Sequence, residues 1–171
     1  MSNNVYRAAI ITVSDKGYRG ERNDESGKLI REILENKRYE VVSYVVLPDE
    51  RILLENEMKK ICDEKLADII LTTGGTGFSP RDCTPEATIA VADRLVPGIP
   101  EAMRMQSIGL TKRAMLSRAA AAIRGQTLIV NLPGSPKSVR ENLEFIITEL
   151  KHGLDILTCN DSECGTGTEQ L

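Results

Sequence analysis

Four short runs of apolar residues divide the chain, and each is followed by a polar or glycine-rich turn. The runs cover residues 6–13, 40–47, 67–71 and 127–131 and are rich in Ile, Val, Leu and Ala. Continuous apolar runs of this length are typical of strands that are buried on both faces of a parallel sheet. Between them, apolar residues recur at three- and four-residue spacing, which predicts amphipathic helices.

The helix signals are strongest at the starts of the segments. Asp24 is a plausible cap for a helix that begins near residue 26, Thr84 and Pro85 form a good helix start, and Ser135 with Pro136 opens the last helix. The polar stretch 16–25 is too long for a simple connection, so we expect it to bind a ligand or to be mobile. The other predicted helices cover residues 51–64, 85–94, 101–108 and a segment that starts near 111, runs through 121 and ends at Gly125.

Strands that alternate with helices predict an α/β fold, with a mostly parallel sheet and helices on both faces. Residues 1–157 are expected to form one domain, because the length suffices for a single core. Residues 158–171 are polar and offer nothing to bury, so we expect a flexible tail.

Composition narrows the possible functions. The chain has 171 residues, 41% hydrophobic and 27% charged, and a formal net charge of -3, which argues against a general nucleic-acid binder. Its 4 cysteines (Cys62, Cys83, Cys159 and Cys164) include no Cys-x-x-Cys pair and there is 1 histidine, so a zinc site is not expected. Reduced thiols and the lack of a leader or membrane-spanning segment point to a cytoplasmic protein that contacts no membrane.

A glycine loop follows the third apolar run. Gly74, Gly75 and Gly77 let the backbone adopt positive φ and approach a ligand closely, and successive N–H groups in such a turn form an anion site. The loop continues through Arg81 and Asp82 into a helix start. It matches neither the Walker loop nor the dinucleotide fingerprint, so the expected phosphate site cannot use either mechanism.

Loops at the carboxyl ends of parallel strands share one edge of the sheet, where ligands bind. Four loops qualify: residues 14–15, 48–49, 73–82 and 133–138. Asp49 and Asp82 would meet there beside phosphate-binding glycines, an arrangement suited to Mg²⁺, with Arg81 or Lys137 neutralising further phosphate oxygens. Each residue has a plainer interpretation: Asp49 as a helix N-cap, Asp82 as a surface partner of Arg81, and Lys137 as a solvated charge.

These loops contain no candidate general base. No histidine lies near them, and Asp82 beside Cys83 should raise the thiol pKa rather than activate the sulfur. A phosphate nucleophile, mostly dianionic near neutral pH with a second pKa of about 6, needs no base. The missing base also argues against a hydrolase or cyclase role in another nucleotide pathway.

Five segments carry motifs in a fixed order: residues 9–15 (AIITVSD), 72–77 (TTGGTG) with 81–88 (RDCTPEAT), 97–98 with 101–104 (PG and EAMR), 116–119 (LSRA) and 132–136 (LPGSP). Together they resemble the molybdopterin adenylyltransferases, the bacterial MogA and MoaB type proteins related to the G domains of gephyrin and its plant counterparts. The resemblance spans about residues 7–157. Ala121 and Ala122 stand where relatives often carry a glycine, and the tail matches no family motif.

The resemblance implies a three-layer α/β/α domain that assembles as a homotrimer and adenylylates molybdopterin with ATP and Mg²⁺, releasing pyrophosphate. The downstream molybdate-insertion enzyme would be a further partner. The alternative is a MoaB-like protein that binds molybdopterin with weak or no transferase activity. The implied site comprises Asp49 and Asp82 as catalytic and metal-binding carboxylates; Ser14, Asp15, Thr73, Gly74, Gly75, Thr76 and Gly77 at the nucleotide and pterin phosphates; and Ser117, Arg118, Pro133, Gly134 and Ser135 at the pterin.

Overall fold

A six-stranded sheet with the order β2-β1-β3-β6-β5-β4 forms the centre of the computed structural model, which describes residues 5–158. The first four strands in this order are parallel, and β5 and β4 continue the sheet in antiparallel pairing. The strands are β1 (Tyr6–Val13), β2 (Tyr39–Leu47), β3 (Ile69–Thr73), β4 (Arg94–Leu95), β5 (Ala121–Arg124) and β6 (Thr127–Leu132).

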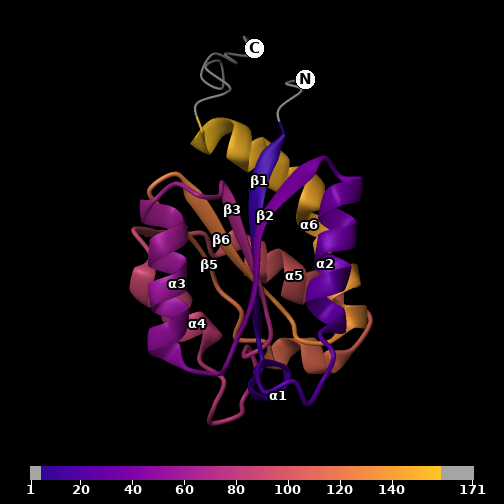
Figure 1. Ribbon diagram of the computed structural model, residues 1–171. Helices are drawn as coiled ribbons and strands as arrows, with labels where there is room; N and C mark the ends of the chain where they lie inside the picture. The colour runs from indigo at the N-terminus through magenta and orange to yellow at the C-terminus, as the bar shows by residue number, and fades with distance from the viewer. Residues whose placement is uncertain (1–4, 159–171) are drawn as a thin grey trace, which may run out of the picture.

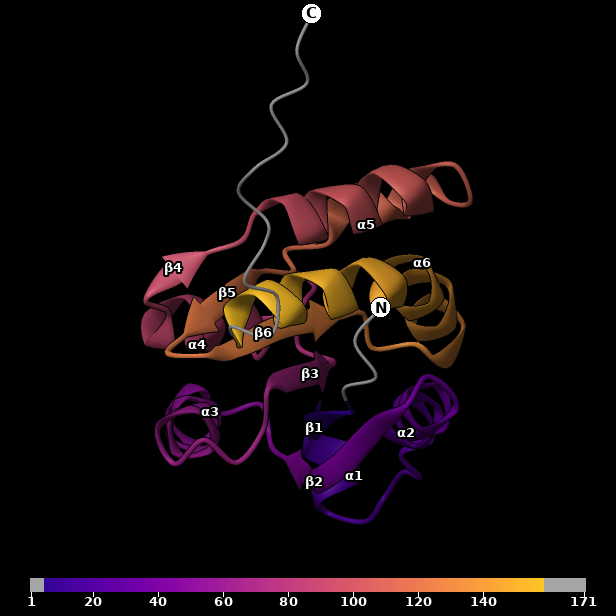
Figure 2. The same ribbon diagram turned by 90° about the horizontal axis from the view of Figure 1, so that it is seen from above.

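Helices cover both faces of this sheet (Figures 1 and 2). One face packs against α2 (Glu25–Asn36), α5 (Gly98–Ile108) and α6 (Pro136–Leu157). The other packs against α3 (Arg51–Asp63) and α4 (Thr84–Val91). Two short elements, α1 (Asp15–Tyr18) and the 3-10 helix η1 (Lys112–Leu116), lie outside these layers. The predicted three-layer, mostly parallel α/β fold is therefore confirmed.

Strand β1 shows why its middle residues, 8–11, are all apolar. Ala8 and Ile10 belong to the core beneath α2 and α6, whereas Ala9 and Ile11 belong to the core beneath α3. Because successive side chains of a strand point to opposite faces, a strand covered on both sides needs apolar residues at every position.

The connections place a crevice between β1 and β3. From β1 the chain passes through α2 to β2 on one side of β1, and then through α3 on the opposite face to β3 on the other side. The loops that leave β1 and β3 therefore diverge to opposite faces of the sheet. Ligands bind at such a switch point in open α/β sheets.

The predicted helix from about 111 to 125 is wrong. Only η1 is helical there, and the alanine-rich segment after it forms β5, in which Ala121 pairs with Val130 and Ala122 with Ile129. Gly125, with φ of +57°, turns the chain directly into β6. Strand pairing and burial of both alanines outweigh the high helix propensity of alanine.

Other boundaries differ by a few residues. The helix expected over 85–94 ends at Val91, and α5 begins at Gly98, three residues before the predicted start at residue 101. The polar stretch 16–25 contains most of α1. The third strand lies two residues later than predicted, at Ile69–Thr73, so both threonines before the glycine loop belong to it.

Two of the three predicted caps are confirmed. Asp24 accepts a hydrogen bond from the Gly27 N–H, and Ser135 accepts one from the Ser138 N–H. Cys83 occupies the N-cap position of α4, and the Thr84 hydroxyl instead donates to the Gly74 carbonyl.

Two further predictions concern the polar tail and the lack of a membrane-spanning segment. The predicted tail lies outside the described residues apart from residue 158, as do Cys159 and Cys164. Over residues 5–158, no helix combines the length and the apolar character needed to cross a bilayer.

Candidate functional site

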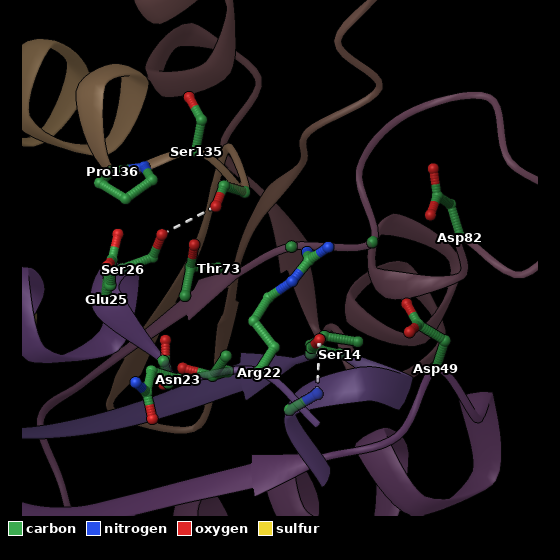
Figure 3. Close-up of a pocket in the computed structure, with 17 residues that line it drawn as sticks. Ser14, Arg22, Asn23, Glu25, Ser26, Asp49, Thr73, Asp82, Ser135 and Pro136 are labelled. Carbon is green, nitrogen blue, oxygen red and sulfur yellow. Dashed lines mark hydrogen bonds between the residues drawn. The ribbon is translucent and has the colours of Figure 1, made fainter. Parts of the chain in front are cut away.

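A cavity of about 570 Å³ opens at the carboxyl edge of the parallel strands, beside the switch point between β1 and β3. Its walls come from the end of β1, the loop before α2, the turn before α3, the glycine loop and the loop before α6 (Figure 3). It is lined by Ser14, Asp49, Thr73, Asp82 and Ser135, which belong to the four loops that were expected to share this edge of the sheet. Loops far apart in the chain thus converge on one cavity.

The glycine loop is held against the end of β1. Gly74 and Gly75 have φ of +94° and +65°, and a Cβ on Gly74 would collide with the Val13 carbonyl. On the other side, the Thr84 hydroxyl donates to the Gly74 carbonyl at 2.9 Å and the Thr84 N–H to the Gly75 carbonyl at 3.1 Å. Only glycine allows this conformation and close approach, which brings the backbone to the cavity.

The opposite wall is fixed by two hydroxyl groups. Ser26 donates to the Gly134 carbonyl at 2.8 Å, and Thr73 donates to the Pro133 carbonyl at 2.7 Å. The N-termini of α2 and α6 consequently face the same cavity (Figure 3). Helix N-termini carry partial positive charge and favour anions.

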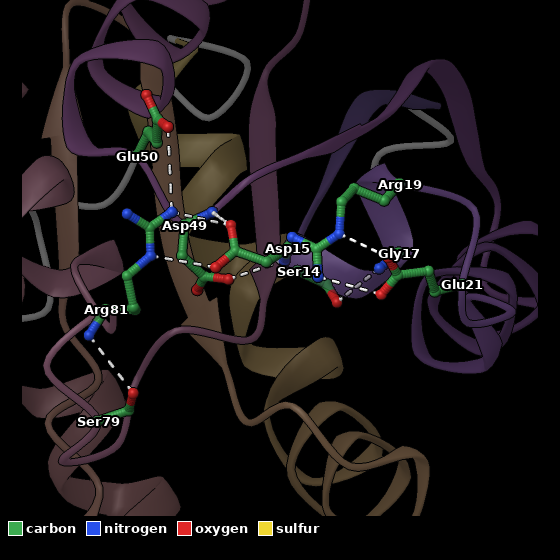
Figure 4. A network of polar contacts seen from close by, with 9 residues as sticks. All are labelled: Ser14, Asp15, Gly17, Arg19, Glu21, Asp49, Glu50, Ser79 and Arg81. Carbon is green, nitrogen blue, oxygen red and sulfur yellow. Dashed lines mark hydrogen bonds and ion pairs between the residues drawn. The ribbon is translucent and has the colours of Figure 1, made fainter.

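Asp49 takes part in a reciprocal contact with Asp15 (Figure 4). The Asp15 N–H donates to Asp49 Oδ2 at 2.9 Å, and the Asp49 N–H donates to Asp15 Oδ1 at 3.1 Å. The N-cap interpretation of Asp49 is wrong, because Glu50 occupies that position and forms no side-chain cap bond. Asp49 is instead anchored through one oxygen.

Arg81 binds Asp15 rather than its neighbour Asp82. Its Nε and Nη2 donate to the two Asp15 oxygens at 3.1 and 2.9 Å, and Glu50 lies 4.0 Å from Nη2. The interpretation of Asp82 as a surface partner of Arg81 is therefore wrong. These hydrogen bonds are the main reason that the pKa of Asp15 lies below its usual value.

The remaining carboxylate oxygens suit a divalent cation. Asp82 Oδ2 accepts from the Ser79 N–H at 3.1 Å, whereas Asp49 Oδ1 and Asp82 Oδ1 accept no hydrogen bond from the described residues. Burial, with the charges of Asp15 and Asp82 adding to it, raises the pKa of Asp49. A divalent cation would relieve this repulsion, and Mg²⁺ needs only one or two carboxylates when phosphate and water complete its shell. Within residues 5–158, no group of three or more His, Cys, Asp or Glu side chains could hold a metal.

A second cavity of about 260 Å³ lies along the same two loops. Thr76, Gly77 and Pro133 line it together with Ser117 and side chains of α5, while the neighbouring Gly75 and Gly134 line the larger cavity. The predicted site residues are therefore divided between two cavities. Asp15 and Arg118 line neither of them.

Arg118 and Lys137 have other partners. The Arg118 guanidinium donates to backbone carbonyls of the glycine loop and to Glu86. Lys137 is 85% exposed and lies 3.9 Å from Glu141, so the structure supports its interpretation as a solvated charge. Burial is the main cause that raises the pKa of the Cys83 thiol, and Asp82 adds to it as expected.

The polar stretch 16–25, which was expected to bind a ligand or to be mobile, contributes lining residues that the sequence did not single out. Arg22, Asn23 and Glu25 line the larger cavity, and Arg22 is the only basic residue among its described lining residues. The unusual length of this stretch was the available signal. Figure 3 shows the Arg22 guanidinium pointing across the cavity.

The start of α2 is packed closely at Gly27. A Cβ there would lie 2.6 Å from the Thr12 hydroxyl oxygen and closer still to oxygens of Asp24 and Tyr44. Tyr44 donates to Asp24 at 2.5 Å, so the absence of a side chain lets the capping aspartate join α2 to β2. This contact fixes the helix N-terminus that faces the cavity.

The fold defines a class of protein, the open and mostly parallel α/β sheets that bind a ligand at the switch point. Here a glycine loop, two helix N-termini and two carboxylates meet at that point, and this combination suits a phosphorylated ligand. Comparison with known proteins specifies the family. Residues 9–152 match the family described as "Probable molybdopterin binding domain". The chain belongs to this molybdopterin-binding family.

Individual relatives agree with this assignment. The molybdopterin adenylyltransferase of Helicobacter pylori (strain J99) is 42% identical over 153 residues, covering 88% of this chain and 87% of the relative. The Escherichia coli enzyme of the same name is 40% identical over 146 residues, covering 84% and 74%. The crystal structure of the molybdopterin biosynthesis enzyme MoaB from Thermus thermophilus has a TM-score of 0.85 and 48% identity, covering 90% of this chain and 97% of that one. The resemblance found in the sequence is thus confirmed.

Proposed function

We propose that this protein is a molybdopterin adenylyltransferase of molybdenum cofactor biosynthesis, acting in the cytoplasm. The observation that carries the proposal is the placement of Asp49 and Asp82 beside the glycine loop in one cavity. The relatives named for this activity at 40–42% identity support it.

The reaction joins two phosphates. An oxygen of the terminal phosphate of molybdopterin attacks the α-phosphorus of ATP, a new P–O bond forms, and the bond between the α-phosphorus and the bridging oxygen breaks. Adenylyl-molybdopterin and pyrophosphate are the products. Because the nucleophile is already anionic near neutral pH, the site needs no general base, in keeping with the lack of one in the predicted loops.

Asp49 and Asp82 would hold Mg²⁺, which when bound offsets the negative charge that builds up on the phosphate oxygens. The glycine loop and the N-termini of α2 and α6 would bind the phosphates through N–H groups. Arg22 adds a positive charge from the opposite wall. The protein's role is therefore to orient the two phosphates and balance their charge.

We assign the triphosphate of ATP to the larger cavity and the pterin of molybdopterin to the smaller one. The two cavities are lined by consecutive residues of the same loops, so a ligand pair that meets at a phosphate could extend into both. Ser117 and Pro133 line the smaller cavity and are candidates for contact with the pterin. The larger cavity lies within the range of about 300–1,000 Å³ that is usual for small-molecule sites.

The protein is also proposed to be a homotrimer. Apolar side chains are exposed along α5 and the segment that follows it, a pattern typical of interaction surfaces. These side chains are Met105 (74% exposed), Ile108, Leu110, Met115 and Leu116.

Incubation of the protein with molybdopterin, ATP and Mg²⁺ tests the activity. We expect pyrophosphate and adenylyl-molybdopterin in equal amounts, and no product when EDTA replaces the metal. Tight molybdopterin binding without pyrophosphate release would instead identify the MoaB-like binding protein and refute the transferase.

A further inference from the structure

Arg118 reaches from the segment between η1 and β5 to the loop that carries Asp82. Its backbone N–H donates to the Thr76 carbonyl at 3.0 Å, and its Nε donates to the Gly77 carbonyl at 2.6 Å. Nη2 donates to the carbonyl of Asp82 at 3.0 Å, and Nη1 pairs with the Glu86 carboxylate. One side chain thus joins both ends of loop 77–82 to the first turn of α4.

The loop has few other restraints. Within it, the Asp82 N–H donates to the Ser79 carbonyl at 2.9 Å, and the Ser79 N–H donates back to the Asp82 carboxylate. Phe78 is 70% exposed, and the residues that follow it are exposed up to Arg81. Without the bonds from Arg118, the position of the Asp82 carboxylate would depend on this small turn and on the partly exposed ion pair between Arg81 and Asp15, which holds the loop at the residue before Asp82.

Arg118 is itself held from behind. Arg104 of α5 donates from Nη1 to the Ser117 carbonyl at 3.3 Å and to the Ala119 carbonyl at 3.1 Å, on either side of Arg118. A planar guanidinium with five donors can serve several acceptors at once, whereas a lysine ammonium has no such fixed geometry. The contacts therefore depend on arginine geometry as well as on charge.

We propose that Arg118 is a positioning residue, which holds loop 77–82 so that the Asp82 carboxylate stays in the metal-binding arrangement with Asp49. Arg118 lines neither cavity, and its described donors are directed at protein acceptors. This role differs from the pterin contact that the family resemblance implied. It rests on the proposed function only in taking Asp82 as a metal-binding carboxylate.

Hydrogen exchange tests the restraint itself. We would compare wild type, Arg118→Gln and Arg118→Lys, with Arg124→Gln as the control, by mass spectrometry of peptides covering residues 77–82. Arg124 has matching interactions away from the cavities, with Asp63 and the Val91 carbonyl. Exchange in the loop should be faster by at least about tenfold in both Arg118 variants and unchanged in the control.

Metal binding tests the consequence for Asp82. Electron paramagnetic resonance of Mn²⁺ with α,β-methylene-ATP measures metal affinity without turnover. Arg118→Gln should weaken Mn²⁺ binding by at least about tenfold, and the Lys variant should fall short of wild type, because charge alone does not restore the loop. The control should bind Mn²⁺ like wild type.

Kinetics distinguish positioning from ligand contact. Arg118→Gln should lower kcat and raise the Mg²⁺ concentration required, with little change in the KM for molybdopterin. A raised KM for molybdopterin with normal Mn²⁺ affinity would overturn the positioning role, as would unaltered exchange in the loop or a wild type that binds no Mn²⁺. Failure of wild type to release pyrophosphate would refute the proposed function instead, because exchange and Mn²⁺ binding require no turnover.

Discussion

Asp49→Asn gives the sharpest test of the proposed metal site. The amide oxygen can still accept the Asp15 N–H that Asp49 Oδ2 accepts at 2.9 Å. The Asp49 N–H can still donate to Asp15 at 3.1 Å, because the backbone is unchanged. The change therefore preserves the contact that anchors residue 49. Its free oxygen, Oδ1, is replaced by an NH₂ group that donates hydrogen bonds and cannot bind a cation.

The expected loss follows from the charge removed. Two unit charges about 4 Å apart attract by about 4 kcal/mol at an effective dielectric constant of about 20, and a divalent cation by about twice that. Water and the remaining Asp82 carboxylate recover part of this energy. A net loss of about 3–4 kcal/mol at the transition state lowers kcat by two to three orders of magnitude, at about 1.4 kcal/mol for each factor of ten.

Asp49→Asn should lower activity, but it should not lower the stability of the ligand-free protein. Burial raises the pKa of Asp49 above its ordinary value of about 3.9, so the ionised form is disfavoured in the folded protein. The folded wild type is not destabilised by this charge at pH values below the ordinary pKa, where the carboxyl is protonated in both states. The destabilisation grows as pH rises and is complete above the raised pKa of the folded state. The variant carries no such charge, so without ligands it should be at least as stable as wild type at pH 7.

The assay combines pyrophosphate release with thermal unfolding in the presence and absence of Mg²⁺ and α,β-methylene-ATP. Wild type should gain stability from the pair of ligands, and Asp49→Asn should lose most of that gain. Glu50→Gln is the control, because it removes the charge of the neighbouring residue. The Glu50 side chain is 56% exposed and lines neither cavity. A variant that releases pyrophosphate at the wild-type rate would refute the metal role of Asp49.

Three further changes test other parts of the structure. Arg22→Gln should raise the KM for ATP by about fivefold, equivalent to about 1 kcal/mol. Lys28→Gln, on the helix that follows, should leave this KM unchanged. Equal effects of the two substitutions would exclude a specific role of Arg22 in the cavity. Gly27→Ala should destabilise the protein by about 1–3 kcal/mol in urea unfolding, because the crowding described above outweighs the gain in helix propensity; a more stable variant would contradict it. Met105→Glu should lower the mass found by light scattering. Ile52, which is 66% exposed on α3, provides the control, and Ile52→Glu should leave the mass unchanged. An unchanged mass for both variants would place the trimer contact elsewhere.

Local patterns were enough to predict the parallel core of the fold. Strands such as β1 are buried on both faces, so their apolar composition leaves little room for another interpretation. The rule that parallel strands end at one edge then brought Asp49 and Asp82 to the same cavity, as observed. These predictions succeeded because the strands and the ends of the loops are determined by residues that are neighbours in the chain.

Predictions were wrong where distant residues determine the structure. The alanines of β5 favour a helix on their own, and their pairing with β6 becomes clear only in the folded sheet. The plainer interpretation of Asp82 paired it with Arg81, but the partner of Arg81 is Asp15, 66 positions away in the chain. The two backbone carbonyls that accept from the Arg118 guanidinium lie 36 and 41 positions away, and nothing local in the sequence indicates them.

The charges around the larger cavity explain why metal and nucleotide should bind together. Its described lining residues include four carboxylates, Asp24, Glu25, Asp49 and Asp82, and one basic side chain, Arg22. Such a surface would repel a free triphosphate, since helix N-termini and one exposed arginine supply only modest attraction. Under the proposed function, a nucleotide that arrives with its cation would turn the repulsion of Asp49 and Asp82 into binding energy. The same pair of carboxylates would then provide selectivity for the metal complex over free ATP.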